Sequence, residues 1–371
     1  MADDKANNLM RVVYSVVNEN GFGNNIMALA RAYVIAQTSG LSYQAPVWPS
    51  CMHVKPATPN GYGYYFPSSR AERIKFALYK NQIRLNARLP FQFPYSTLLF
   101  TREAYTQTEI EDVGEACDAF LKTRGLNDPA RSLILRVSPG TWGGYAGIKR
   151  ARTWITNLLL SHGDTRTRFE QIEDRLGKRL RVALHVRMGD FAARDHAAAP
   201  GERNVRLPLE WYARICRQIR EQIDCELILV TDGELSEFTD FVDEFRPLHI
   251  IGEDYTDLLS ILLLSHANLV VCSNSTYSRL ACFLNDTPYI WPADTLAPDE
   301  SGKYGYLWEG LGNPVPASDD SDPEAIRRCF ALPVDFVCLP HGIIRYLESH
   351  GKAPIEIGAD LFYKDPVSLL H

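Results

Sequence analysis

The chain has 371 residues, of which 46% are hydrophobic and 23% charged, a composition of globular proteins and a length sufficient for two domains with separate cores. The formal net charge of −6 argues against a nucleic-acid partner, because binding to a phosphate backbone requires clustered lysine and arginine. The first residues, MADDKANNLM, lack the pattern of a secretory signal, and no run of about 18 apolar residues occurs, so we expect no transmembrane segment and a cytoplasmic protein.

The first half begins with a strand, a glycine-containing turn and a helix. Residues 11–17 (RVVYSVV) form an apolar run of strand length, and apolar side chains recur at helical spacing from Ile26 onward. Gly40 suits the left-handed position that ends a helix. Further strands are predicted at residues 41–47 and 131–140. The arrangement strand, glycine turn, helix is typical of phosphate-binding loops.

A long segment rich in proline, glycine and tyrosine follows the second of these strands. Its aromatic residues could stack on sugar rings or simply pack beneath a long loop, and both interpretations remain open. These residues are Trp48, Tyr62, Tyr64, Tyr65 and Phe66.

The second half alternates strongly between strand and helix patterns. Such alternation predicts right-handed βαβ units and a parallel sheet, preceded by a charged helix at residues 165–178. The predicted strands are 181–190, 225–234, 248–252 and the beginning of 268–285; the predicted helices are 207–222, 234–245, 255–267 and the end of 268–285. The region from about Leu296 is rich in proline and less regular.

Polar side chains follow these strands, at the edge of a parallel sheet where ligands bind. They are His185, Arg187, Asp190, Thr231, Asp232, Ser273, Asn274, Ser275 and Thr276. An arginine can bind phosphate through two hydrogen bonds, and the start of a helix after Ser275 attracts anions through free N–H groups. The set therefore favours a nucleotide diphosphate.

Each of these residues also has an interpretation that needs no ligand. Arg187 could form a salt bridge with Asp190, Ser275 could serve only as a helix N-cap, and Asp232 could be an acidic residue at a helix N-terminus. The coincidence of all of them in one sheet favours the binding site.

Other site classes are disfavoured by their spacing. The glycine turn places Ile26 where the dinucleotide fingerprint requires its third glycine, which disfavours a nicotinamide oxidoreductase. The histidines and the eight cysteines show neither H-E-x-x-H nor C-x-x-C spacing, so no metal is expected. Asp320-Ser321-Asp322 matches a D-x-D motif, but Asp322 followed by Pro323 is better explained as a helix N-cap.

Three segments, in order and spacing, resemble the motifs of the fucosyltransferase superfamily, which includes bacterial α1,2-fucosyltransferases, α1,6-fucosyltransferases and protein O-fucosyltransferases. HVRMGD (185–190) resembles H-x-R-x-G-D, SNSTYSRLACFLN (273–285) resembles S-N-S-S-F-S-x-W-x-A-x-L-N, and NGFGNNIMALARA resembles the G-x-G-N-Q loop and helix. The chain departs from these motifs at Asn25, Arg279 and Leu280.

The resemblance implies an α/β protein of the GT-B fold, with two Rossmann-like domains facing across a cleft. The expected domains are an acceptor-side domain at residues 1–170 and a GDP-sugar-binding domain at residues 171–371. The implied activity is transfer of fucose from GDP-fucose to a hydroxyl of a glycan or glycoconjugate, inverting and without a metal. No separate cofactor is implied, because GDP-fucose is a substrate.

The resemblance also implies roles for individual residues. Arg187 would hold the β-phosphate beside His185, Asp232 would face the guanine or ribose, and the Ser273-Asn274-Ser275-Thr276 segment would line the pyrophosphate. The turn formed by Gly21, Phe22, Gly23 and Asn24 would approach the donor from the first domain. The catalytic base remains open among Asp195, which we favour, Asp190, Glu202 and Glu19.

Two alternatives to the fucosyltransferase remain open. The first keeps the GT-B fold with another nucleotide sugar. The second is a non-catalytic protein that binds a nucleotide sugar or a glycan, because the aromatic pair of the family motif is replaced and the base is undecided.

Overall fold

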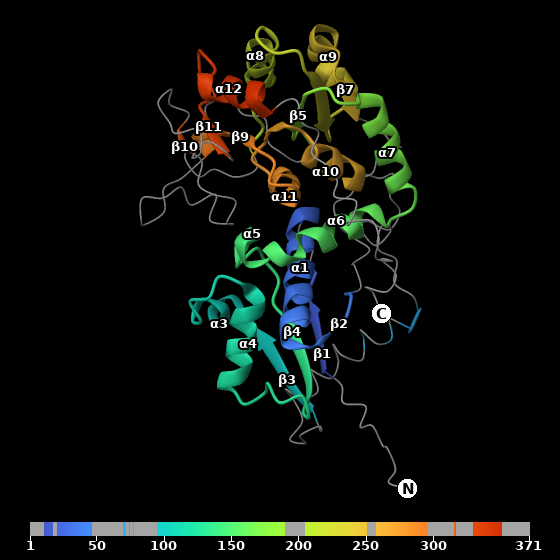
Figure 1. The fold of residues 1–371 in the computed structure, drawn as a ribbon, viewed down its shortest axis with the longest axis vertical. Helices are drawn as coiled ribbons and strands as arrows, with labels where there is room; N and C mark the ends of the chain where they lie inside the picture. The colour runs from blue at the N-terminus through green and yellow to red at the C-terminus, as the bar shows by residue number, and fades with distance from the viewer. Residues whose placement is uncertain are drawn as a thin grey trace. The chain divides into compact units, whose positions relative to one another are not determined.

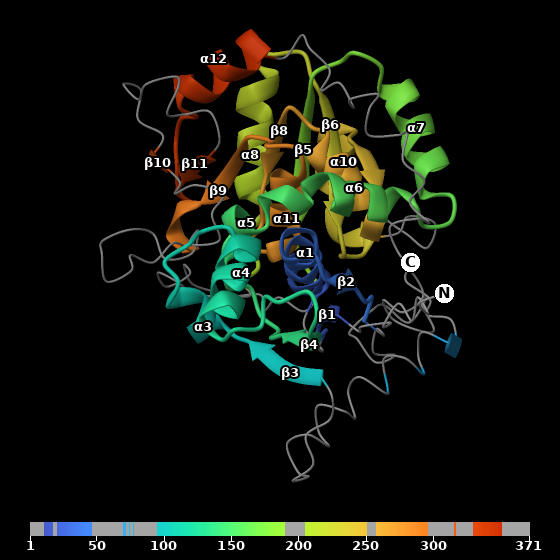
Figure 2. The same cartoon turned by 60° about the horizontal axis from the view of Figure 1, so that its bottom comes forward.

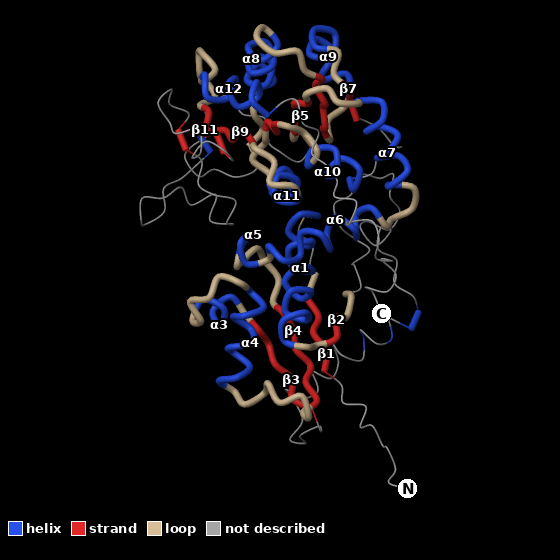
Figure 3. The backbone as a smooth tube through the Cα atoms, viewed as in Figure 1, coloured by secondary structure: helices blue, strands red, loops and turns tan. Residues whose placement is uncertain are grey.

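The computed structural model describes residues 11–17, 21–46, 70–71, 74, 77, 95–189, 205–250, 257–295, 315–316 and 329–350. The contacts among them divide the chain into two compact units, one before and one after the junction between Ala151 and Arg152. Each unit is an α/β structure built on its own parallel sheet, and Figure 3 shows the alternation of strands and helices in both. The predicted α/β class is therefore confirmed.

The first unit has a four-stranded sheet in the order β2-β1-β4-β3, with all neighbours parallel. Its strands are β1 (Arg11–Ser15), β2 (Ser42–Tyr43), β3 (Tyr95–Phe100) and β4 (Ser132–Val137), as drawn in Figure 1. Its helices are α1 (Phe22–Ser39), α3 (Arg102–Thr106), α4 (Val113–Thr123), α5 (Gly144–Gly147) and a short 3-10 helix (Lys149–Ala151).

Helix α1 begins at Phe22 rather than at Ile26, because Phe22 and Asn25 are buried and extend the packed part of the helix. It ends as predicted at Gly40, which has φ 63° and ψ 32° and donates its N–H to the carbonyl of Ala36. Helices α1 and α4 lie side by side, as Figure 2 shows. A side chain at Gly114 of α4 would come within 2.2 Å of Thr38 Oγ1, so this close approach requires glycine.

The second unit has a seven-stranded parallel sheet in the order β10-β11-β9-β8-β5-β6-β7. The strands are β5 (Arg181–Val186), β6 (Glu226–Thr231), β7 (Leu248–Ile250), β8 (Leu269–Val271), β9 (Tyr289–Pro292), β10 (Val315–Pro316) and β11 (Cys329–Leu332). All six residues of β5 are buried, which explains its continuous apolar pattern in the middle of a parallel sheet.

Helices cover both faces of this sheet. One face packs against α8 (Leu209–Arg220), α9 (Thr239–Phe245) and α12 (His341–His350), whose apolar side chains share one core with β5 and β6. Helices α10 (Asp257–Ser265) and α11 (Thr276–Leu284) contact each other and the helices α6 (Arg152–Leu160) and α7 (Thr165–Leu176). Short 3-10 helices follow β6 (Leu235–Phe238) and β9 (Ala293–Thr295). The predicted boundary near residue 170 falls inside α7, whereas the structure keeps α6 and α7 with the second unit.

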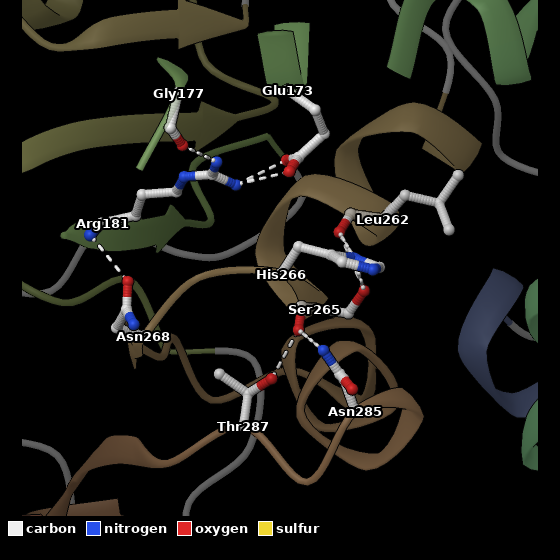
Figure 4. A network of polar contacts seen from close by, with 9 residues as sticks. All are labelled: Glu173, Gly177, Arg181, Leu262, Ser265, His266, Asn268, Asn285 and Thr287. Carbon is white, nitrogen blue, oxygen red and sulfur yellow. Dashed lines mark hydrogen bonds and ion pairs between the residues drawn. The ribbon is translucent and has the colours of Figure 1, made fainter. Parts of the chain in front are cut away.

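A polar network at the amino end of β5 ties these layers together (Figure 4). Arg181 donates two hydrogen bonds to Glu173 of α7, at 2.6 and 2.7 Å, and another to the carbonyl of Gly177. At the end of α10, the carbonyl of Ser265 accepts hydrogen bonds from Thr287 Oγ1 at 2.6 Å and from Asn285 Nδ2 at 3.2 Å. These bonds satisfy groups that the end of a helix leaves exposed.

The strand order creates a topological switch point in the second unit. From β5 the chain proceeds to β6 and β7 on one side of the sheet, whereas from β8 it proceeds to β9 on the other. Because β5 and β8 are neighbours and the chain continues from them in opposite directions, the carboxyl ends of these two strands are where open parallel sheets usually bind ligands. The sheet order therefore points to one place where a ligand would bind.

Several elements were not predicted. The sequence analysis assigned nothing to β3, α3 and α4, and it described the region from Leu296 as irregular, where the structure has β11 and α12.

Within the described parts of the chain, none of the helices has the length and apolar character needed to cross a bilayer.

Candidate functional site

The loops after β5, β6 and β8 bring together polar side chains at the switch point. Arg187 follows β5, Asp232 follows β6, and the segment Ser273–Thr276 follows β8. Arg187 Nη1 lies 2.8 Å from Asp232 Oδ2, with 32% and 21% of the two side chains exposed. The structure thus shows an ion pair between Arg187 and Asp232; Asp190, the partner considered from the sequence, lies outside the described residues.

Both carboxylate oxygens of Asp232 have a partner from the loop after β5. Its Oδ1 accepts a hydrogen bond from the backbone N–H of Met188 at 2.7 Å, while Oδ2 contacts Arg187. A Cβ at Gly189 would stand 2.5 Å from Oδ2, so only glycine permits this approach. Asp232 does not act as the N-terminal acid of the next helix, because Glu234 caps that helix reciprocally with Glu237. The carboxylate instead joins the β5 and β6 loops.

His185 is buried at the end of β5, with only 4% of its surface exposed. Its Nδ1 lies 2.8 Å from Ser273 Oγ and 2.9 Å from Ser278 Oγ, and its ring stacks on Tyr277 at 5.1 Å. Burial, assisted by the charge of Arg187, lowers the pKa of His185 to about 3, so the imidazole is neutral at pH 7. His185 therefore ties β5 to the segment after β8; its contact with a nucleotide stays a prediction.

The segment after β8 forms a capped helix start. Ser275 is the N-cap of α11, and its hydroxyl accepts a hydrogen bond from the N–H of Tyr277 at 3.2 Å. The N–H of Ser275 donates to the carbonyl of Ser273 at 2.8 Å. Helix capping by Ser275 is confirmed, and it leaves open whether the same helix start also holds a phosphate.

The glycine turn lies in the first unit. Gly21 is the N-cap of α1 but supplies no capping side chain, and no acidic residue lies in the first helical turn. Phe22 and Gly23 are already helical, and a Cβ at Gly21 would meet no atom within 4 Å. Among the described residues, the buried Oδ1 of Asn24 has no hydrogen-bond partner. This helix start therefore retains capacity to bind a polar group.

Several predicted residues lie outside the described part of the chain. These are Glu19, Asp190, Asp195, Glu202, the Asp320–Asp322 motif and the aromatic residues Trp48, Tyr62, Tyr64, Tyr65 and Phe66. Within the described ranges, no cluster of three or more histidine, cysteine or acidic side chains has the arrangement of a metal site.

Sequence reasoning missed three residues that shape the site: Gly189, Tyr277 and Ser278. The glycine of HVRMGD was available as a signal, because a glycine shortly after a strand permits a close approach of another group to the backbone. The contact of Ser278 with His185 depends on β5 and β8 being neighbours, which the sequence does not specify.

Comparison with known proteins gives the following. The chain is similar to the solved structure of fucosyltransferase NodZ from Bradyrhizobium, with 16% identity, a TM-score of 0.40, and coverage of 73% of this chain and 92% of that one. NodZ α-1,6-fucosyltransferase soaked with GDP-fucose has 17% identity and a TM-score of 0.41, covering 74% of this chain and 92% of that one. POFUT1 in complex with GDP-fucose has 15% identity and a TM-score of 0.40, covering 75% of this chain and 97% of that one. No protein-family model matches the chain, and no curated protein matches it.

Proposed function

We propose that the chain is a glycosyltransferase that moves fucose from GDP-fucose to a hydroxyl group of a glycan or glycoconjugate. The observation that carries the proposal is the convergence of Arg187 and the Ser275 helix start at the switch point between β5 and β8. A guanidinium and a helix N-terminus that follow two neighbouring strands are suited to a diphosphate. The motif resemblance selects GDP-fucose among the possible nucleotide diphosphates.

In the proposed reaction, the acceptor oxygen bonds to C1 of the sugar as the bond between C1 and the β-phosphate oxygen breaks. The electron pair leaves with GDP, and attack from the opposite face inverts the anomeric centre. Arg187 and the backbone N–H groups before α11 would stabilise the charge that develops on GDP. Because these groups supply positive potential themselves, we propose that no metal is required.

The proposed architecture is the GT-B arrangement, with the second unit binding the nucleotide and the first binding the acceptor. In this proposal, Asp232 faces the base or ribose, His185 and Ser273–Thr276 order the pyrophosphate region, and the Gly21–Asn24 turn contributes polar contacts to the donor. Its buried Asn24 Oδ1, which has no partner among the described residues, supports the last assignment.

The proton of the acceptor hydroxyl would pass to a carboxylate, for which we propose Asp195, with Asp190 and Glu19 as the next two candidates and Glu202 after them. A positioned base contributes on the order of 10²- to 10⁴-fold to the rate. We therefore expect Asp195→Asn to reduce kcat by that factor while GDP affinity is unchanged. Near-normal turnover in this variant would eliminate Asp195 and direct the same test to the other candidates.

The decisive experiment is calorimetric titration of the full chain with GDP, UDP, ADP and NAD in the presence of EDTA, followed by a nucleotide-sugar panel with mixed glycan acceptors. GDP-selective binding and release of GDP from GDP-fucose only when acceptor is present would support the proposal. Turnover of a different nucleotide sugar would replace fucose as the donor. Selective binding without turnover would instead favour a non-catalytic nucleotide-sugar-binding protein, and saturable binding of NAD would contradict the proposal.

A further inference from the structure

Arg31, in the middle of α1, is a fully buried arginine whose partners are all backbone carbonyls. Its Nη1 donates to the carbonyl of Trp142 at 3.1 Å, and Nη2 donates to those of Gly140 at 2.5 Å and Ser138 at 3.4 Å. The guanidinium carbon lies 4.3 Å from the centre of the Trp142 ring. Among the described residues no carboxylate pairs with it. A buried cation without an anion is costly, so the three carbonyls must offset its desolvation.

The three carbonyls belong to residues 138–144, here called the Arg31 loop, which directly follows β4 at the carboxyl edge of the first sheet. Thr141 to Gly144 form a turn in which the N–H of Gly144 donates to the carbonyl of Thr141 at 3.2 Å. Gly143 has φ 77° and ψ −14°, the values that a type II turn requires at its third residue. This turn orients the peptide between Trp142 and Gly143 so that its carbonyl meets Arg31.

The same contacts determine where the N–H groups of this loop point. All described peptide bonds are trans, so the N–H of each peptide is directed opposite to its carbonyl. Because the carbonyls of Gly140 and Trp142 are directed at Arg31, the N–H groups of Thr141 and Gly143 are directed away from it. No backbone carbonyl of the described residues accepts a hydrogen bond from either group. Both residues are partly exposed to solvent.

A positive charge behind two peptides also strengthens their N–H groups as donors, because hydrogen bonds in a chain polarise one another. Burial lowers the pKa of Arg31 to about 9, which still leaves the guanidinium protonated at neutral pH. The guanidinium charge, which solvent does not reach, therefore acts by polarising the peptides of the Arg31 loop. Polarised N–H groups without a carbonyl partner are suited to a negatively charged oxygen.

We propose that Arg31 is a positioning residue that shapes the Arg31 loop into a site for an anionic oxygen of the acceptor: a carboxylate, or a phosphate or sulfate ester. The proposal rests on the proposed function, in which the first unit binds the acceptor. The donor diphosphate is assigned to the second unit, where Arg187 and the Ser275 helix start provide its partners. The acceptor is thus a glycan or glycoconjugate with an acidic substituent.

Arg11 provides a matched comparison within the same unit. It also donates to backbone carbonyls, those of Asp128 at 2.6 Å, Arg131 at 2.9 Å and Leu126 at 3.4 Å. It lies at the opposite, amino edge of the sheet, and the loop that it holds uses its own amides: Arg131 N–H donates to the Asp128 carbonyl and Ala130 N–H to the Asp128 carboxylate. Arg11 is therefore the control for an arginine that holds a loop in place and has no further role.

The test is an NMR titration of the deuterated, ¹⁵N-labelled full chain with sodium sulfate, following the amide signals of Thr141 and Gly143. Both signals should shift saturably in the wild type and in Arg11→Met, and at least about tenfold more weakly in Arg31→Met, a loss of about 1.4 kcal/mol. Arg31→Lys keeps a charge but not the three-way geometry, so it should lose part of the effect. If Arg31→Met does not fold, Arg31→Lys alone still tests the proposal. GDP affinity, measured in parallel by calorimetry, should be the same in all four proteins.

Several results would overturn the inference. One is the absence of a saturable shift at Thr141 and Gly143 in the wild type, and another is an equal shift in Arg31→Met. Displacement of sulfate by saturating GDP would assign the loop to the donor instead and overturn the acceptor assignment. A wild type that fails to bind GDP but shows the Arg31-dependent sulfate shift would refute the proposed donor and leave the anion site itself supported.

Discussion

The two arginines that flank β5 should have separable roles, Arg187 in GDP binding and Arg181 in stability. Arg181 lies at the amino end of the strand with 7% of its side chain exposed, and it pairs with Glu173, of which 22% is exposed. Arg187 lies beyond the carboxyl end and is 32% exposed in its pair with Asp232. We therefore compare the same substitution at both positions, Arg181→Met and Arg187→Met.

The expected magnitudes follow from these surroundings. A hydrogen bond to a charged group contributes about 1.5–3 kcal/mol, which is roughly 10- to 150-fold in affinity. Because Arg187 exchanges Asp232 for phosphate on binding, Arg187→Met should weaken GDP binding by roughly 10- to 30-fold, the lower part of that range. Removing Arg181 leaves Glu173 without its cation, so Arg181→Met should lower the free energy of unfolding by about 3–5 kcal/mol.

The assay combines calorimetric titration with GDP and thermal unfolding of the wild type and both variants. Arg181→Met should unfold roughly 10 °C lower with an unchanged Kd measured well below its transition. Arg187→Met should raise the Kd and lower the Tm by less than Arg181→Met does, because Asp232 keeps the hydrogen bond from the N–H of Met188. Equal loss of GDP affinity in both variants, or an unchanged Kd in Arg187→Met, would refute the assignment of the carboxyl edge as the binding site.

Three further outcomes are expected. Gly189→Ala should weaken GDP binding by about tenfold in calorimetry, because its Cβ would stand 2.5 Å from Asp232 Oδ2 and displace the carboxylate that we propose faces the base or ribose; unchanged affinity would show that this contact does not matter. Thr287→Val should cost about 1 kcal/mol of stability in urea unfolding without affecting GDP affinity, because Ser265 O keeps its second donor. Since the folded pKa of His185 is below its unfolded value near 6.5, its stabilisation is present above that pH and should decline by up to about 1.4 kcal/mol per pH unit from 6.5 toward 3. Urea unfolding at each pH should show a shallower decline for His185→Gln, and identical slopes would contradict the buried neutral imidazole.

The second unit could be predicted well from the sequence because its central strands are buried on both faces. Strands β5, β6 and β8 appear as continuous apolar runs, and the helices between them show helical periodicity. The first unit gave weaker signals. Strand β3 lies at the edge of its sheet, contains the polar residues Ser96 and Thr97, and leaves Leu99 exposed by 46%, so its apolar pattern is weaker than that of a strand buried on both faces.

The partners of the site residues could not be predicted, because they depend on which strands are neighbours. The ends of β5 and β6 meet only once the sheet order is known, and this order brings Arg187 to Asp232, a pair that the sequence analysis did not consider. Arg31 was missed for a related reason. An arginine in the middle of a helix is usually on the solvent face, and only the apolar residues on every side of it, in IMALARAYVIA, indicate burial.

Arg31 and Arg187 show how the partner of a guanidinium determines what it can do. Arg187 pairs with a carboxylate at a partly exposed edge, and a phosphate can replace that carboxylate because it also offers two anionic oxygens to the guanidinium. Arg31 is fully buried and bound to carbonyls that are fixed in the backbone, so no ligand can reach it or replace its partners. Its charge reaches the surface only through the peptides that it orients. A direct contact with a ligand is therefore expected from Arg187, whereas Arg31 can affect a ligand only through the N–H groups of Thr141 and Gly143.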